Sequence, residues 1–179
     1  MAQPYRIERV RIMWDPWQDA QDAGYQIVQS LSTIGSGEFL GMGLGVGVSK
    51  YDYLPEAHTD FAFAIFAQEH GYLGVLLVIA LFFMLAVCCY YISARARDIY
   101  GQILTLGIML LVVGQAAGNL FMVSGTFPVV GIPLPFISYG GSSLLVTMAS
   151  MGILLNICHH GVQVQRGEVR PEEHDAAHQ

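Results

Sequence analysis

Three long runs of apolar residues dominate the chain after its first third. They cover residues 71–93, 101–123 and 142–160. Each is long enough to cross the apolar core of a bilayer, which takes roughly 20 helical residues for about 30 Å. No Asp, Glu, Lys or Arg occurs within 99–165, and Glu69 is the only one within 61–93. Such stretches cannot form a water-facing surface, so the pattern predicts an all-α, polytopic membrane protein with three transmembrane helices.

Basic residues beside these runs predict the orientation, because Lys and Arg favour the cytoplasmic side of short connections. The linker after the first run contains Arg95 and Arg97, and the polar tail also contains arginines, whereas 124–141 contains none. We therefore expect the linker and a disordered tail, 162–179, to be cytoplasmic. The connection 124–141 is expected outside.

The segment 1–60 is polar and glycine-rich, yet it carries several large aromatic residues. These are Trp14, Trp17, Tyr25, Tyr51 and Tyr53. Aromatic side chains with one polar edge favour the membrane interface. We expect 1–60 to be a long extracytoplasmic loop with short helices, lying on the membrane ahead of a transmembrane region over 61–161.

Composition narrows the function. Hydrophobic residues make up 54% of the 179 residues and charged residues only 12%, about half of the ~25% usual in soluble proteins. The net charge of -6 disfavours a nucleic-acid binder, which needs basic groups to neutralise phosphates. The three cysteines lie in apolar runs without metal-ligand spacing, so neither a disulfide framework nor a metal site is predicted.

A cluster of ionisable residues stands just before the first apolar run. It consists of Glu56, His58, Asp60 and Glu69. Ionisable groups at a membrane boundary are costly and tend to be functional. The alternative is structural, since Thr59 or Asp60 could cap a helix that begins at Phe61, with the negative charge favoured by the helix dipole.

The connection between the second and third runs is rich in proline and glycine. Pro133 and Pro135 forbid a regular helix there, and irregular backbone at membrane depth must be buried in protein or line a cavity. Ser142 and Ser143 follow at the start of the third helix. A helix N-terminus is a natural site for an anion such as phosphate, although these serines could equally form a simple capped helix start.

One face of the second run is polar and small. Gln115 and Asn119 are four residues apart and share a face, as do Gly114 and Gly118. Such faces usually pack closely against another membrane helix. We expect packing here rather than a transport path.

Several motifs together resemble a known family. The runs YLPEAHTDFAFAI and GIPLPFISYGGSSL, with DPW at 15–17, GYQ at 24–26 and GSG at 35–37, are similar to the SEDS proteins (shape, elongation, division and sporulation). PEAHTDF and PFISYGGSSL look more like the division and sporulation members, FtsW and SpoVE, than like RodA. The similarity extends over about residues 5–161.

The resemblance implies a peptidoglycan glycosyltransferase in the bacterial plasma membrane, at the division septum, which polymerises lipid II for cell division or cell wall synthesis. The chain corresponds to the C-terminal part of such proteins. Implied partners are lipid II, the undecaprenyl-diphosphate-linked glycan, a class B penicillin-binding transpeptidase and other division proteins, with no nucleic acid. A lipid II transporter, and a non-catalytic fragment that only binds a transpeptidase, are the alternatives.

The resemblance also assigns residues. The family's essential acidic residue is Asp60, which would act as the base that takes a proton from the acceptor hydroxyl. For the diphosphate leaving group the resemblance assigns no residue, and we expect Lys50 and the helix start at Ser142 and Ser143 to supply the cationic and N–H donors.

Three further ionisable residues are expected near this base. Glu56 and His58 would be neighbouring partners or cation ligands, and the resemblance does not decide whether a divalent cation takes part. Glu69 is the one acidic residue just before Gly71, a place where members of the family commonly have two acidic residues.

Overall fold

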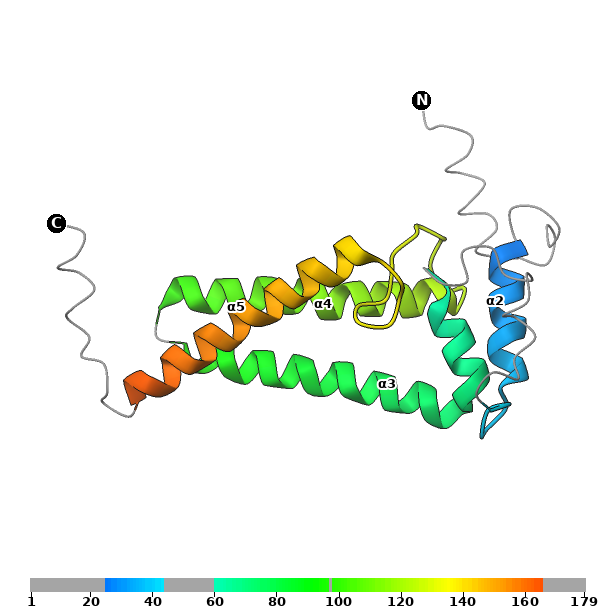
Figure 1. The fold of residues 1–179 in the computed structure, drawn as a ribbon, viewed down its shortest axis with the longest axis horizontal. Coiled ribbons are helices and arrows are strands. Elements are labelled where there is room, and N and C mark those ends of the chain that lie inside the picture. The colour runs from blue at the N-terminus through cyan, green and yellow to red at the C-terminus, as the bar shows by residue number, and fades with distance from the viewer. Residues whose placement is uncertain (1–24, 44–59, 97, 166–179) are drawn as a thin grey trace, which may run out of the picture.

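The computed structural model describes residues 25–43, 60–96 and 98–165. Its elements, in chain order, are α2 (Tyr25–Ser36), α3 (Ala62–Arg95), α4 (Ile99–Val123) and α5 (Gly141–Gln165). Within these residues the fold is entirely helical (Figure 1). The last three helices are long and apolar enough to cross a membrane. The predicted fold class, all-α with three membrane-spanning helices, is confirmed.

Helix α3 is broken at Gly71 into two pieces. Gly71 has φ 64° and ψ -162°, a backbone conformation open essentially to glycine alone. Residues 62–70, which we call the arm, therefore turn away from the rest of α3 (Figure 1). The predicted span 71–93 begins at this kink, and the helix considered from Phe61 corresponds to the arm, which begins at Ala62.

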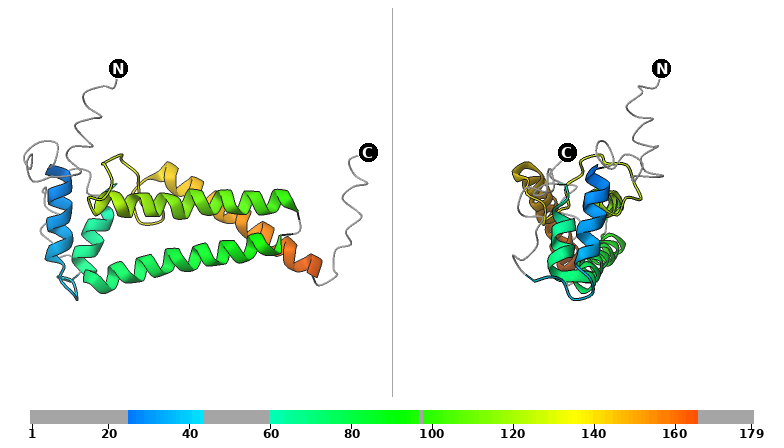
Figure 2. Two further views of the ribbon diagram at one scale, coloured as in Figure 1. Left: turned by 180° about the vertical axis from the view of Figure 1, so that it is seen from behind. Right: turned by 90° about the vertical axis from the view of Figure 1, so that its right-hand side faces the viewer.

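Helix α2 packs beside the arm and against the end of α4 (Figures 1 and 2). The Ser30 hydroxyl donates to the Val123 carbonyl oxygen at 2.9 Å, and the Gln68 Nε2 donates to the Ser36 hydroxyl at 2.7 Å. Ser30 and Ile27 are buried on the inner face of α2. These contacts fix the arm and α2 as a small platform at one end of the membrane helices.

Beyond the kink, α3 and α4 run antiparallel, and α5 crosses them obliquely (Figure 2). The corner between α3 and α4 is tied by two reciprocal hydrogen bonds. The Gln102 Nε2 donates to the Ala96 carbonyl oxygen at 3.1 Å, and the Ser93 hydroxyl donates to the Gln102 carbonyl oxygen at 3.3 Å. Val78 and Phe82 of α3 are buried in the same core cluster as Val112 of α4.

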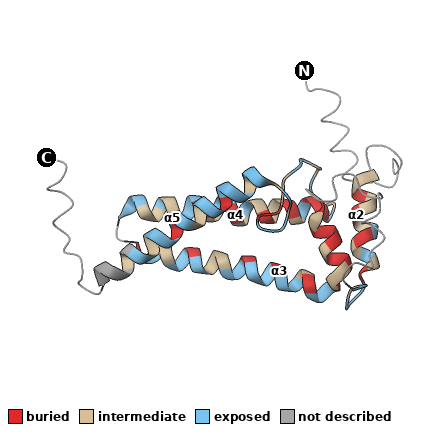
Figure 3. Cartoon of the chain, viewed as in Figure 1, coloured by how far each residue is buried: buried red, intermediate tan, exposed pale blue. Residues whose placement is uncertain are grey.

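Burial is concentrated at the platform end (Figure 3). Phe61, Met122, Val123 and Leu134 are almost fully buried there. Large apolar side chains along the middle of α3, α4 and α5 are instead exposed, among them Leu77, Phe83, Leu110, Leu145 and Leu155. Apolar residues on the outside and packed residues at one end are what a lipid environment requires.

The helix ends differ slightly from the prediction. Helix α4 begins at Ile99 instead of 101, and α5 extends over Gly141–Gln165 instead of 142–160. The tail was expected to be disordered from 162, but a single Gly161 does not end a helix when no proline follows it. Residues 166–179 lie outside the described residues.

Candidate functional site

The proline-rich connection between α4 and α5 folds back against the helices. Leu134 and Pro135 are almost fully buried, and a turn is closed by the Leu134 N–H, which donates to the Ser138 hydroxyl at 2.8 Å. Gly131 and Phe136 both have positive φ angles, 73° and 68°. The expected irregular backbone is therefore present and packed into the protein, as its polar groups require.

Two side chains of α4 hold this connection in place. The Asn119 Nδ2 donates to the Ile132 carbonyl oxygen at 2.6 Å, and the Gln115 Nε2 donates to the Pro133 carbonyl oxygen at 2.9 Å. Asn119 is completely buried. We call Gln115 and Asn119 the clamp. We expected this polar face to pack against another helix, but the two amides donate to carbonyl oxygens of a loop.

The clamp also contacts Asp60, two residues before α3. The same Asn119 Nδ2 donates to the Asp60 carbonyl oxygen at 2.8 Å. Asn119 thus joins two segments that are distant in sequence, the start of the arm and the proline-rich connection. Its Oδ1 has no hydrogen-bond partner among the described residues. The side chain of Asn119 therefore acts here as a hydrogen-bond donor only, through Nδ2.

Asp60 is half-buried where the arm meets the connection. Its Oδ2 lies 3.0 Å from the position that a Cβ atom would take on Gly131. The N-cap position of α3 belongs to Phe61, which makes no side-chain capping bond, and the helix begins at Ala62. Asp60 therefore stands one residue before the observed N-cap, because the helix begins one residue later than the structural alternative expected.

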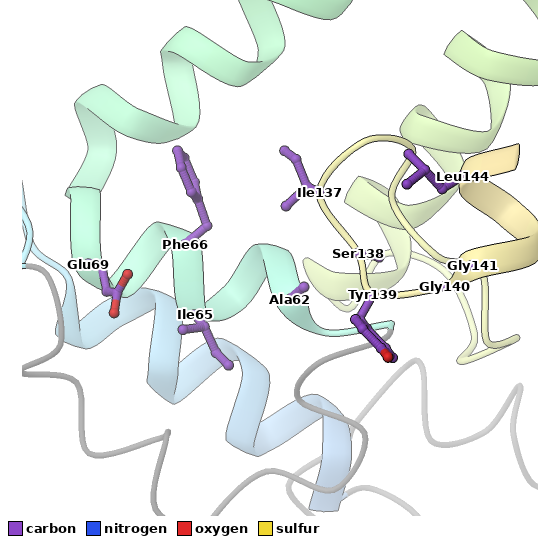
Figure 4. A pocket seen from close by; sticks show the side chains of 10 residues that line it. All are labelled: Ala62, Ile65, Phe66, Glu69, Ile137, Ser138, Tyr139, Gly140, Gly141 and Leu144. Carbon is purple, nitrogen blue, oxygen red and sulfur yellow. The ribbon is translucent and has the colours of Figure 1, made fainter. Parts of the chain in front are cut away.

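A cavity of about 780 Å³, which we also call the groove, opens between the arm and the connection (Figure 4). One wall is a single face of the arm, starting two residues after Asp60. The other wall is the connection and the start of α5. The lining residues are Ala62, Ile65, Phe66, Glu69, Ile137, Ser138, Tyr139, Gly140, Gly141 and Leu144.

The cavity has an apolar middle and polar positions around it. Phe66 and Ile137 extend from its opposite walls, and Glu69 stands at the far end of the arm from Ala62 (Figure 4). Over these seven residues the arm rises about 10 Å. Glu69 therefore lines the groove at the end away from Ala62, and Asp60, two residues before Ala62, is too far along the chain to form a close pair of carboxylates with it.

The start of α5 contributes backbone donors to the same cavity. Gly140, Gly141 and Leu144 line it, and Ser142 and Ser143 stand between them in the first turn of α5. The Leu144 N–H donates a hydrogen bond to the Gly140 carbonyl oxygen at 2.9 Å. The N–H groups of the residues before it have no partner within the helix, so an anion is favoured at this wall.

Some predicted site residues are not placed. Lys50, Glu56 and His58 lie outside the described residues. Across the part that is described, no group of three or more His, Cys, Asp or Glu side chains could hold a metal ion. Of the described candidates, Glu69 lines the groove, Asp60 lies two residues before its first lining residue on the arm, and Ser142 and Ser143 lie between its lining residues Gly141 and Leu144.

The roles of Gly131, Tyr139 and the clamp were missed in the sequence. A buried amide in an apolar run was the available signal for Asn119, whereas nothing local marked Gly131 or Tyr139. Their positions depend on how the connection folds back.

Residues 1–163 match a family described as "Cell cycle protein", which groups FtsW, RodA and SpoVE. The chain is 44% identical over 153 residues to a "Probable peptidoglycan glycosyltransferase FtsW" of Geobacter sp. (strain M18), covering 86% of this chain and 42% of that protein. It is 46% identical over 171 residues to the protein of the same name in Hahella chejuensis (strain KCTC 2396), covering 94% and 43%. Stage V sporulation protein E of Bacillus subtilis (strain 168) is 42% identical over 160 residues, covering 89% and 44%.

A solved structure is similar as well. It is described as "Structural coordination of polymerization and crosslinking by a peptidoglycan synthase complex", with a TM-score of 0.72 and 29% identity over 90% of this chain and 44% of that chain. The chain thus spans less than half the length of the proteins it matches. The family match and these identities confirm the resemblance carried by the two long motifs, and the chain belongs to the FtsW, RodA and SpoVE family of cell cycle proteins.

Proposed function

We propose that this chain forms the C-terminal part of a peptidoglycan glycosyltransferase that polymerises lipid II, with Asp60 as its catalytic base. The observation that carries the proposal is the position of Asp60, a half-buried residue whose carboxylate lies against Gly131 of the connection, two residues before the first arm residue that lines the groove. A substrate with a lipid tail and a polar headgroup needs a reactive group at this depth. The curated relatives are named for this activity.

The chemistry needs a base and a site for the leaving group. Asp60 takes the proton from the attacking sugar hydroxyl as the glycosidic bond forms at the anomeric carbon, and the lipid diphosphate departs from that carbon. The N-terminus of α5, with Ser142 and Ser143, faces the groove from the other wall and favours the negative charge of a diphosphate. Lys50 is proposed as the cationic partner of the same group, and Glu56 and His58 as neighbours of Asp60.

Glu69 has a different place in this proposal. It stands at the far end of the groove, about 10 Å along the arm from Ala62, which is too distant for it to share a proton with Asp60. A carboxylate there is suited to a hydroxyl or amide of the sugar or peptide headgroup. Glu69 is therefore proposed as a binding residue.

The membrane helices and the relatives support a proposed setting for this activity. We place the protein in the bacterial plasma membrane at the division septum. The linker containing Arg95 is cytoplasmic, so the groove at the other end of the helices is on the outer side. The partner is a class B penicillin-binding transpeptidase, because polymerised strands must be cross-linked. The similar solved structure is described as coordinating polymerization and crosslinking.

The test uses the full set of membrane helices, since this chain covers less than half of its relatives. A full-length relative carrying this C-terminal part, purified with its transpeptidase, is supplied with lipid II, and the glycan length is measured on gels. We expect Asp60→Asn to lower polymerisation by about 100-fold or more, the usual contribution of a general base.

Asp98→Asn is the matched control. It removes one exposed carboxylate at the opposite end of the membrane helices, so normal glycan length is expected. Normal polymerisation by the Asp60→Asn protein, with insertion unchanged, would overturn the catalytic role.

A further inference from the structure

We propose that residues 38–42, in the part of the chain after α2 that the structure describes, form a finger that inserts its apolar tip into the outer interface of the lipid bilayer. The tip consists of Phe39, Leu40 and Met42, whose side chains are 63%, 78% and 45% exposed. The inference is independent of the catalytic proposal. It concerns the surface of the platform rather than the groove.

The finger is held rigidly by the kink in α3. Gly41 and Gly71 are in direct backbone contact, so that a Cβ atom on either would overlap the other's segment. The Met42 N–H donates to the Gln68 carbonyl oxygen at 3.0 Å, and the Tyr72 N–H donates to the Glu38 carbonyl oxygen at 3.1 Å. These are the groups that a helix break leaves unpaired. The finger therefore has a fixed position relative to the membrane-crossing piece of α3.

That position is at the edge of the bilayer. From Arg95 to Gly71 the helix rises about 36 Å at ~1.5 Å per residue, while the apolar core of a bilayer is about 30 Å thick. With Arg95 at the cytoplasmic boundary, the kink falls just outside the apolar core on the other side. This is the headgroup zone, where aromatic residues are enriched.

The apolar tip also continues the lipid-facing surface of α3. The Phe39 ring stacks on the Tyr72 ring, with centroids 5.7 Å apart, one residue past the kink. From Tyr72 the exposed apolar surface continues along α3 through Leu73, Leu76 and Leu77. If Leu77 contacts lipid, as expected for the membrane-crossing piece of α3, the same apolar surface extends to Phe39. The finger should then contact the same bilayer.

The attachment is apolar rather than electrostatic. The finger contains no Lys or Arg, and its one charged residue is Glu38, so anionic headgroups are not its ligand. The lipid tails and the glycerol region supply the matching chemistry, because an exposed apolar tip of this size is uncommon on a water-facing surface. Its binding should then depend little on headgroup charge.

The experiment places a fluorescent reporter at the tip. The full chain contains two tryptophans, so Trp14→Phe and Trp17→Phe supply a background in which Phe39→Trp is the only tryptophan. The protein is reconstituted into phosphatidylcholine vesicles whose acyl chains carry bromine near either the headgroup end or the methyl end. Aqueous acrylamide is a second quencher.

The matched control is Ser32→Trp in the same background. Ser32 is exposed and lies on the side of α2 opposite its buried residues Ile27, Ser30 and Thr33. Phe83→Trp, on the exposed surface of α3 within the membrane-crossing piece, reports what full lipid contact gives. Leu40→Trp repeats the test at the tip if Phe39→Trp disturbs its ring stack.

We expect bromine near the headgroup end to quench Phe39→Trp at least twofold more than bromine near the methyl end, and more than it quenches Ser32→Trp. Replacing half of the lipid by phosphatidylglycerol should leave this unchanged. Quenching of both tip tryptophans by acrylamide alone would overturn the proposal in favour of a water-exposed tip. Protection from both quenchers would overturn it in favour of a protein contact.

Discussion

The carboxylate of Asp60 lies directly against the backbone of Gly131, with Oδ2 3.0 Å from the place of a Cβ atom. Gly131 also has a positive φ of 73°, which residues with a Cβ adopt at a cost. The start of the arm and the proline-rich connection therefore meet at a point where only glycine fits. The next residue, Ile132, is the one that Asn119 ties to the Asp60 carbonyl oxygen.

Substitution Gly131→Ala should displace Asp60. The added methyl group would contact Oδ2 at 3.0 Å, and the positive φ adds strain of about 1–3 kcal/mol. We expect polymerisation of lipid II by a full-length protein to fall about tenfold or more. Gly152→Ala is the control, since a Cβ on Gly152 has nothing within 4 Å. Equal glycan yields from the two variants would show that the contact does not position Asp60.

Substitution Asn119→Leu should loosen the site while keeping the volume of the side chain. It leaves the carbonyl oxygens of Asp60 and Ile132 without their donor, and a buried unpaired group costs about 1–3 kcal/mol. Detergent titration followed by circular dichroism measures the stability. Asn156→Leu is the same substitution at an exposed position of α5 and should change stability little.

Coupling within the clamp can be measured with a second variant. Gln115→Leu removes the donor to Pro133, one turn before Asn119 on the same face. If both amides hold one connection, the double variant should lose less stability than the sum of the two single losses. The expected difference is at least about 0.5 kcal/mol, since coupled contacts differ from additivity by about 0.5–3 kcal/mol. Strict additivity would mean that the two amides act on independent segments.

Substitution Gly71→Ala should detach the finger from the arm. Its methyl group would overlap the backbone N of Gly41, and φ 64° with ψ -162° is unfavourable for alanine. We expect a loss of about 1–3 kcal/mol in stability, together with faster protease cleavage within residues 38–42. Gly107→Ala, on an exposed surface of α4 with open space around it, should be neutral or stabilising by up to about 1 kcal/mol.

The membrane helices were predictable because hydropathy alone identifies them. Charge is almost absent from 99–165, and a stretch that long has no other solvent than lipid. Pro133 and Pro135 likewise excluded a helix through a local rule that no tertiary contact reverses. The cluster that contains Asp60 could be noticed because ionisable groups at a membrane boundary are costly, and the family resemblance then selected Asp60 within it.

The contacts that build the site were not predictable. Spacing put Gln115 and Asn119 on one face of a helix, but it contains no information about whether a helix or a loop covers that face. The kink at Gly71 depends on a positive φ, and a glycine inside an apolar helix is compatible with either a straight or a broken course. The meeting of Asp60 with Gly131 arises only when both of these are in place.

The orientation of the helices can be tested by cysteine accessibility. Asp98 and Ser124 are exposed at opposite ends of α4, and the Arg95 side is expected in the cytoplasm. In a background with the three native cysteines replaced by serine or alanine, a membrane-impermeant maleimide added to intact spheroplasts should label Ser124→Cys and leave Asp98→Cys unlabelled until the membrane is opened. The reverse labelling would place the groove on the cytoplasmic side, where a base acting on extracytoplasmic glycan could not work, and would therefore contradict the proposed function as well as the orientation.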